Sequence, residues 1–133
     1  DRNARKSLKE IKLDYPHGTG HGVGYFLNVH EGPQSLSKNN KINFKSGMIV
    51  SNEPGYYKEG NFGIRIENLI YIKKNKFEEL TMAPIEKDLI NKKMLNKKEI
   101  VWLNKYHTKV KKNLLRFMNN EEKANLVEAC SPV

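Results

Sequence analysis

The stretch HGTGHGVG at residues 17–24 places two histidines four positions apart among four glycines. Histidines at that spacing can share one face of a helix, but so much glycine excludes a stable helix here. The stretch is therefore predicted to be a loop whose backbone approaches another element closely and presents His17 and His21 at defined points. Imidazoles held in this way suit metal binding or proton transfer near neutral pH. A tight turn with hydrogen-bonded histidines is the alternative.

Residues farther along the chain could join these histidines. His30 follows the loop, and Glu53 stands where a strand-like run breaks into Pro-Gly. Glu67 lies within residues 63–73, which carry the longest strand signal of the chain and are expected to be buried. Because an isolated buried carboxylate is costly, Glu67 is expected either to bind a metal or to pair with Arg65 on the same strand face.

One histidine with several carboxylates is an oxygen-rich ligand set. Such a set favours Mn, Fe or Co, with Zn possible, over the thiolate-rich sites of structural zinc. Carboxylates can also bridge two ions that activate one water and polarise a carbonyl group. Three ligands are too few for two ions, so the sequence predicts an incomplete site.

The order of the predicted elements indicates an α+β domain. Apolar residues spaced three and four apart predict a short helix that ends near Lys12 and a longer helix over residues 97–118. Asn96 and Glu99 form a capping box at the start of the longer helix. Period-two patterns and turn residues predict the strands. Those strands are expected at residues 26–30, from 47 to the break at 53, at 63–73 and at 77–80, and a last helix at about 121–130.

Two other reactive side chains are given ordinary structural roles. His107 falls on the apolar stripe of the long helix and is predicted to be a packed core residue. Cys130 is the only cysteine, so it cannot form an internal disulfide, which suits a reducing compartment such as the cytoplasm. It is expected to pack as a small buried residue.

Composition narrows the possible partners. Hydrophobic residues make up 38% and charged residues 29%, which fits a folded chain rather than a disordered one. The net charge is +9, but the lysines are spread along the chain and often stand beside asparagine, so we expect solvated surfaces and no nucleic-acid binding. No apolar run is long enough to cross a bilayer, and the polar first residues do not form a signal peptide, so no membrane association is expected.

Four motifs in the right order resemble the aminopeptidase P family of the pita-bread metallopeptidases. They are HGTGHGVG at 17–24, FLNVHEGPQ at 26–34, GMIVSNEPGYY at 47–57 and FGIRIENL at 62–69. The likeness continues through LTMAPIEKDLI, WLNKYH and EACSP, and so covers essentially the whole chain. It implies the C-terminal portion of a pita-bread fold, a curved antiparallel sheet with helices packed outside. Residues 1–85 would be the C-terminal half of the catalytic domain, and residues 86–133 a helical extension.

The resemblance also implies roles for individual residues. His21 and Glu53 match ligands of one ion, and Glu67 matches the glutamate that bridges two divalent ions, with manganese expected and zinc or cobalt possible. His17 and His30 match histidines that contact substrate and assist proton transfer. Arg65 matches an arginine that supports the metal-binding carboxylates without binding the ions.

One departure from the family pattern concerns the metal site. The family has two aspartate ligands before the glycine-rich loop, whereas Asp1 and Asp14 both align with non-ligand positions. The chain is therefore expected to be a fragment that carries three of five ligands and is inactive alone.

The resemblance implies that the parent enzyme releases the first residue of peptides with proline in second position, by attack of a metal-bridging hydroxide. It also implies a homo-oligomer, expected to be a dimer. A prolidase-like dipeptidase and a non-catalytic pita-bread binding module are the alternatives.

Overall fold

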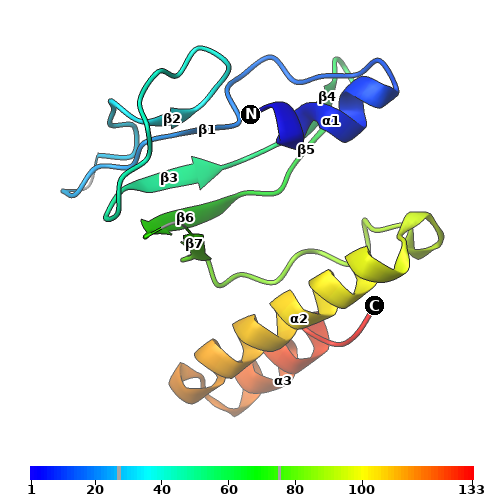
Figure 1. Ribbon diagram of the computed structural model, residues 1–133. Coiled ribbons are helices and arrows are strands. Elements are labelled where there is room, and N and C mark those ends of the chain that lie inside the picture. Colours follow the sequence, from blue (N-terminus) through cyan, green and yellow to red (C-terminus); the bar gives the residue numbers. More distant parts are fainter. Residues whose placement is uncertain (27, 75) are drawn as a thin grey trace. The chain divides into compact units, whose positions relative to one another are not determined.

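In the computed structural model, which describes residues 1–26, 28–74 and 76–133, the chain divides into two units, Asp1–Thr81 and Met82–Val133 (Figure 1). The first unit contains α1 and the short strands, and the second contains the two longer helices. Helices together with antiparallel sheets make this an α+β fold, as the sequence predicts.

The strands of the first unit form small antiparallel sheets, which follow the helix α1 (Arg2–Glu10) in the sequence. They are β1 (Gly20–His21) with β2 (Ser35–Leu36), β4 (Gly55–Lys58) with β5 (Phe62–Arg65), and a sheet in the order β3 (Ile49–Asn52), β6 (Asn68–Lys73), β7 (Lys76–Glu79). A further bridge between Gly22 and Val50 ties the segment after β1 to β3.

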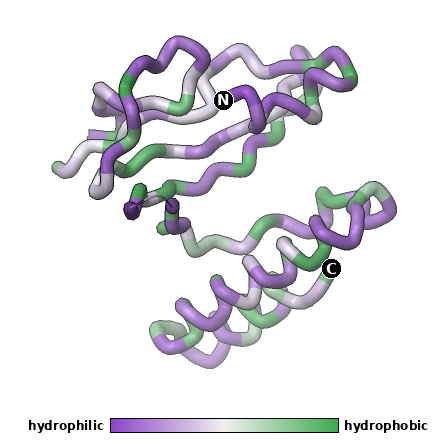
Figure 2. Tube along the Cα trace, in the orientation of Figure 1, coloured by the Kyte–Doolittle hydropathy of each residue, from purple (hydrophilic) through white to green (hydrophobic). Residues whose placement is uncertain are grey.

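The centre of the first unit lies where β3 meets β6. Val50 is fully buried and stands opposite Ile70, which is also buried. Tyr15 and Thr19, which flank the first histidine of the loop, are buried as well. Figure 2 shows hydrophobic residues along β3 and β6, whereas α1 is mostly hydrophilic and buries none of its residues.

Two predicted strands differ from the structure. The described residues of 26–30 form no strand, because the Gly24 amide donates to the Asn28 carbonyl at 2.8 Å and closes a reversal; Leu27 lies outside the described residues. The predicted strand 63–73 is two strands, since β5 pairs with β4 while β6 pairs with β3. The chain changes partner between Arg65 and Asn68. Glu67 therefore lies in the break and is exposed, not buried within a strand.

The second unit is built from α2 (Lys97–Leu114) and α3 (Asn120–Ala129), with 3₁₀ turns η1 (Lys92–Met94) and η2 (Leu115–Phe117). The capping box predicted at Asn96 is present, and α3 begins with a second one. The core contains Val110 and Cys130, which confirms the packed cysteine.

The long helix also departs from its predicted length. The predicted core role of His107 is confirmed, since its exposure is 0%. However, the α-helix ends at Leu114 and tightens into η2, so the predicted stripe does not extend to Phe117, which is 72% exposed. Among the described residues, no helix has both the length and the apolar character needed to cross a membrane.

Candidate metal centre

The glycine-rich loop is held against β3. A Cβ atom on Gly20 would lie 1.8 Å from the Ser51 carbonyl oxygen, so only glycine allows this approach. The His21 amide donates to Ser51 Oγ at 2.9 Å, and the Glu53 amide donates to the Thr19 carbonyl at 2.7 Å. The loop and the end of β3 are thus joined on both sides of Gly20, which confirms the predicted close approach.

Three of the predicted site residues converge. Ligand atoms of His21, Glu53 and Glu67 all lie within 4.8 Å of one another. Glu53 is buried, with 8% exposure, His21 is half-buried, and Glu67 is exposed. The group therefore has one ligand in the protein interior and one facing solvent, as an accessible metal site requires.

The ring of His21 has the tautomer needed for metal binding. Its Nδ1 lies 3.0 Å from the Gly22 carbonyl oxygen, which only accepts, so Nδ1 carries the hydrogen in the neutral ring. Nε2 then presents a lone pair towards Glu53 Oε1 at 3.3 Å. A proton on Nε2 or a metal ion can join two such acceptors, and histidine with carboxylates suits a divalent ion. The residues present therefore fit a divalent metal.

Glu53 is oriented by two further side chains. Ser51 Oγ, which accepts from the His21 amide, donates to Glu53 Oε1 at 2.9 Å. Arg65 Nη1 lies 3.2 Å from Glu53 Oε2. One serine hydroxyl thus fixes the distance between two of the converging residues, while the arginine neutralises the buried carboxylate.

Glu67 is expected from the sequence either to bind a metal or to pair with Arg65. In the structure, Arg65 forms its ion pair with Glu53. The expected pairing of Arg65 with Glu67 assumed one unbroken strand, whereas the structure has two. Glu67 instead lies beyond the end of β5, with its side chain among the converging metal-ligand atoms.

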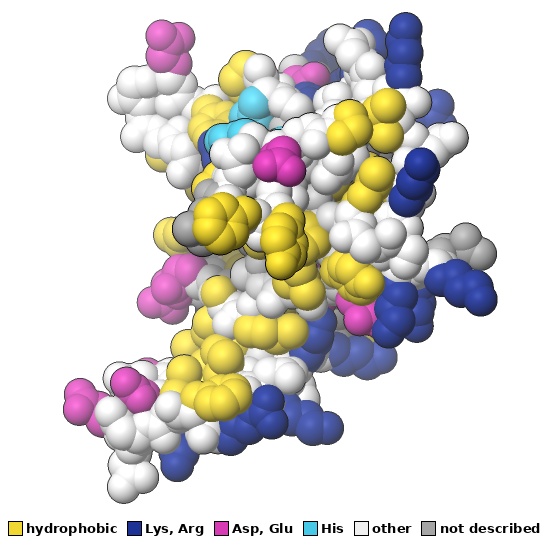
Figure 3. Space-filling model, turned by 90° about the vertical axis from the view of Figure 1, so that its left-hand side faces the viewer, with side chains coloured by type: hydrophobic (Ala, Val, Ile, Leu, Met, Phe, Trp, Pro, Cys, Tyr) yellow, Lys and Arg dark blue, Asp and Glu magenta, His cyan; other side chains and the backbone are white. Residues whose placement is uncertain are grey.

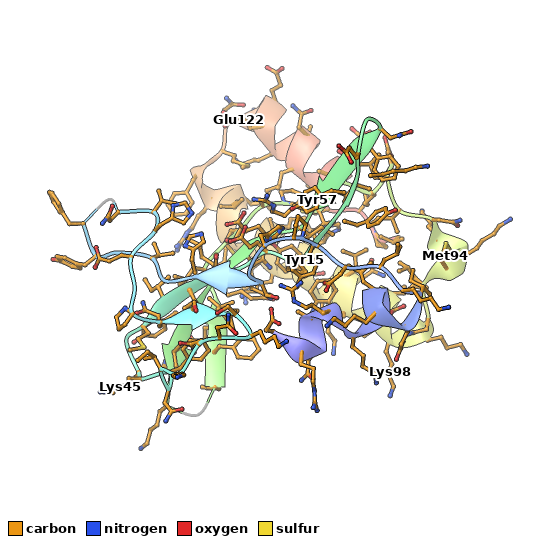
Figure 4. All side chains as sticks on the ribbon, turned by 90° about the horizontal axis from the view of Figure 1, so that it is seen from above. Tyr15, Lys45, Tyr57, Met94, Lys98 and Glu122 are labelled. Carbon is orange, nitrogen blue, oxygen red and sulfur yellow. The ribbon has the colours of Figure 1, made fainter. Side chains whose placement is uncertain are left out.

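Tyr57 links His17 to this group. Arg65 Nε donates to the Tyr57 hydroxyl at 2.8 Å, and the hydroxyl lies 2.8 Å from His17 Nε2. Because His17 Nδ1 lies 2.7 Å from the Gly18 carbonyl oxygen, the neutral ring is protonated at Nδ1, and Nε2 accepts from Tyr57. The Tyr57 hydrogen bond also raises the pKa of Arg65, which remains a cation beside Glu53. Figure 4 labels Tyr57 together with Tyr15, whose ring also contacts His17.

Sequence reasoning missed Tyr57, although the register of the hairpin holds a signal for it. Tyr57 stands opposite Gly63, and a Cβ atom there would lie 2.8 Å from the tyrosine ring. A glycine facing an aromatic residue across a hairpin indicates that the ring lies over the neighbouring strand. The ring can then direct its hydroxyl towards Arg65 and His17.

His30 lies beside the metal-ligand group. Its ring centroid is 4.1 Å from that of His21, although the two residues are separated by the reversal that follows the loop. His30 is exposed. Figure 3 shows histidine side chains at the surface with hydrophobic side chains close by. The structure thus brings His30 next to His21, one of the three converging ligands, where a substrate could reach it.

Comparison with known proteins identifies the family. Residues 1–74 match the model of metallopeptidase family M24, and residues 74–133 match the model of the C-terminal region of that family. The chain belongs to metallopeptidase family M24. This confirms the resemblance found in the sequence motifs.

Xaa-Pro aminopeptidases are among the proteins that this M24 chain resembles over nearly all its length. A probable Xaa-Pro aminopeptidase P from Coprinopsis cinerea is 45% identical, over 93% of this chain and 22% of the relative. The crystal structure of an X-prolyl aminopeptidase from Caenorhabditis elegans, described as a cytosolic enzyme with a di-nuclear active site, is 36% identical with a TM-score of 0.88. That match covers 100% of this chain and 24% of the other. The likeness confirms the predicted pita-bread fold.

Prolidases match a smaller part of this M24 chain. A solved prolidase from Thermococcus sibiricus is 38% identical with a TM-score of 0.55, over 61% of this chain and 22% of its own. The chain spans less than a quarter of the length of each of these three relatives. The match to the Caenorhabditis elegans enzyme includes the second unit of this chain, whereas the match to that prolidase covers only 61% of the chain.

Proposed function

We propose that the whole protein is an Xaa-Pro aminopeptidase, a metallopeptidase that hydrolyses the bond before a proline in second position. The observation that carries the proposal is the convergence of His21, Glu53 and Glu67 in a chain of family M24. The names of the relatives, and the di-nuclear site of the Caenorhabditis elegans enzyme, support the same activity.

His21, Glu53 and Glu67 would bind two divalent ions, with Glu67 bridging them and manganese the expected metal; zinc or cobalt could replace it. When bound, such ions polarise a carbonyl group and activate water. Arg65 would hold the Glu53 carboxylate in place through their ion pair. The remaining ligands are expected in the part of the relatives' length that this chain does not span.

His17 and His30 would act on substrate and protons. The proline nitrogen leaves as a secondary amine and must gain a proton, which a neighbouring imidazole can deliver. His30 is exposed beside His21, as such a role requires. His17 is fixed by Tyr57 with its Nδ1 hydrogen on the Gly18 carbonyl, so it suits the positioning of a substrate group.

The two kinds of role separate in mutants of the whole protein. Glu67→Ala should lower bound metal and abolish release of the first residue from an Xaa-Pro peptide. His30→Ala should keep the metal and lower the rate by about 10²–10⁴-fold, as for a lost acid–base group. Metal stoichiometry measured beside the rate is decisive. If His30→Ala lost metal while Glu67→Ala kept two ions, the assigned roles would be wrong.

Two competing functions predict different substrates. A prolidase cleaves Xaa-Pro dipeptides but not longer peptides, and a non-catalytic module cleaves neither. We expect the whole protein to cleave Xaa-Pro-Xaa tripeptides and to spare Xaa-Ala-Xaa controls. Cleavage of dipeptides alone would favour the prolidase. The match of this whole chain to part of an aminopeptidase argues against that outcome.

We further propose that the protein works in the cytoplasm as a dimer. The cytosolic description of the Caenorhabditis elegans enzyme and the single cysteine support the compartment. Residues 1–85 would complete the catalytic domain, and residues 86–133 would form its helical extension. Fractionation and light scattering of the whole protein would test the compartment and the oligomer.

A further inference from the structure

Arg5 is an unusual residue of α1 because its side chain is only 12% exposed. Its Nε donates to both carboxylate oxygens of Asp1 at 2.9 and 3.0 Å. Nη1 donates to Asp14 Oδ1 at 2.6 Å and to the Tyr15 carbonyl at 2.9 Å, and Nη2 donates to the His17 carbonyl. The guanidinium group also lies 4.0 Å from the centre of the Tyr15 ring. A single arginine thus binds two carboxylates and the backbone carbonyls of Tyr15 and His17.

A second branch runs from Asp1 to the metal-ligand group. Asp1 Oδ1 accepts from Thr19 Oγ1 at 2.7 Å, and the Thr19 hydroxyl lies 2.5 Å from the Tyr15 hydroxyl. Thr19 is buried, and its carbonyl accepts from the Glu53 amide at 2.7 Å. The contacts that begin at Arg5 therefore reach the backbone on both sides of Gly18.

Apolar packing does not explain why α1 lies here. The helix has no buried residue and is mostly hydrophilic, so little apolar surface holds it against the loop. Removing a guanidinium and its carboxylates from water offsets much of their attraction, so the group contributes little net stability compared with apolar packing. What this arrangement does supply is geometry, because a planar fork with five donors fixes its partners in direction as well as distance.

We propose that Arg5 is a positioning residue: it holds the backbone at His17 so that the His17 ring meets Tyr57 beside the metal-ligand group. Arg5 contacts none of the residues proposed to bind metal, and it acts through the His17 carbonyl. The inference rests on the proposed aminopeptidase function. The hydrogen bond from Arg5 holds the pKa of Asp14 below its usual value, so Asp14 stays ionised and keeps the fork aligned.

Arg5→Lys in the whole protein tests the proposal, because lysine keeps the charge but cannot bind Asp1, Asp14 and the His17 carbonyl together. Arg2→Lys is the matched control, since it makes the same change at an exposed position of the same helix. A displacement of about 1 Å can cost about 100-fold in rate, so we expect kcat to fall by about 10- to 100-fold. Bound metal should be unchanged, and Arg2→Lys should behave as wild type.

A double-mutant cycle separates positioning from a general loss of stability. In a His17→Ala background, Arg5→Lys should lower kcat by less than about threefold, because the residue through which it acts is gone. A purely structural role would lower kcat by the same factor in both backgrounds, and that outcome, or an unchanged kcat in Arg5→Lys alone, overturns the proposal.

A milder variant covers the case in which Arg5→Lys does not fold. Asp14→Asn removes the charge of one partner at a half-exposed position, and its smaller loss of kcat should likewise disappear in the His17→Ala background. The failures remain distinguishable: a wild-type protein without Xaa-Pro cleavage would refute the proposed function, whereas an active wild type with additive mutants would refute only the role of Arg5.

Discussion

Removing the hydroxyl group of Tyr57 should lower the reaction rate while the metal site stays intact. Tyr57→Phe keeps the ring over Gly63 but deletes the oxygen that accepts from Arg65 and donates to His17, each at 2.8 Å. Hydrogen bonds of this kind contribute about 0.5–1.5 kcal/mol each, and more where one partner is charged. Arg65 is partly exposed, so water replaces part of its loss. The two bonds together are therefore worth about 1–3 kcal/mol.

That energy fixes the expected effect on the rate. Without the hydroxyl, His17 Nε2 loses its donor, and the ring is free to change its tautomer and orientation. If these hydrogen bonds stabilise the transition state by holding His17 in position, losing about 1–3 kcal/mol corresponds to roughly a 5- to 150-fold fall in kcat. KM should change much less, and bound metal should remain, because the Tyr57 hydroxyl bonds to His17 and Arg65 rather than to the three converging ligands.

The assay is steady-state cleavage of an Xaa-Pro-Xaa peptide by the whole protein, with metal content measured on the same sample. Tyr56→Phe is the matched control, because Tyr56 is the adjacent residue of β4 and contacts Phe62 rather than the site. If Tyr57→Phe and Tyr56→Phe had the same kcat within a factor of two, the chain from Arg65 to His17 would have no role in the reaction.

Four further outcomes follow from the structure. Burial lowers the pKa of His107 below its usual 6.5, so the stability that its neutral form provides should be complete above about pH 6.5. It should be lost as the pH falls towards the folded-state value, by at most about 1.4 kcal/mol per pH unit, and a flat unfolding free energy from pH 7 to 5 would contradict this. Burial raises the pKa of Cys130, so iodoacetamide should label it only after the second unit unfolds, as mass spectrometry can show. Lys87→Met removes a donor to the Glu128 carbonyl near the end of α3 and should cost about 1–2 kcal/mol in denaturant unfolding, whereas Lys98→Met, at an exposed position, should cost almost nothing. The 133-residue chain alone, supplied with manganese, should not cleave Xaa-Pro peptides, because three ligands hold two ions poorly; turnover of about 1 per second or more would refute this.

The sequence predicts that His21, Glu53 and Glu67 converge and that Arg65 supports the carboxylates. It does not predict the contacts of Ser51 and Tyr57. The order of the motifs places these residues in a known family pattern. The glycines of the loop, Gly20 among them, predict a close backbone approach, which the structure shows to be against β3. Tyr57 is missed because a tyrosine after a Pro-Gly break looks like any strand residue. Only the pairing register of the hairpin formed by β4 and β5 places it opposite Gly63.

Two of the errors, the single strand predicted at 63–73 and the burial of Glu67, have one physical cause. Period-two patterns describe alternation along a strand but not the identity of the pairing partner. Residues 62–73 keep their alternation through the point where the chain leaves β4 and joins β3, so one strand is predicted where there are two. The burial of Glu67 was inferred from that unbroken strand. The helix 97–114 is better predicted, because its spacing and capping box are local.

Because these strands are short, contacts outside the strand ladders must fix the geometry of the metal-ligand group. Two-stranded hairpins as short as β1–β2 and β4–β5 are marginal by themselves. The metal-ligand group draws one residue from β1 and two from the segments that flank β4–β5, so ladder hydrogen bonds within each hairpin cannot fix its geometry. The contacts that cross between hairpins do so: the Ser51 hydroxyl between His21 and Glu53, and the Tyr57 hydroxyl between His17 and Arg65. Polar residues outside the group of three converging ligands therefore set the distances on which any chemistry at this site depends.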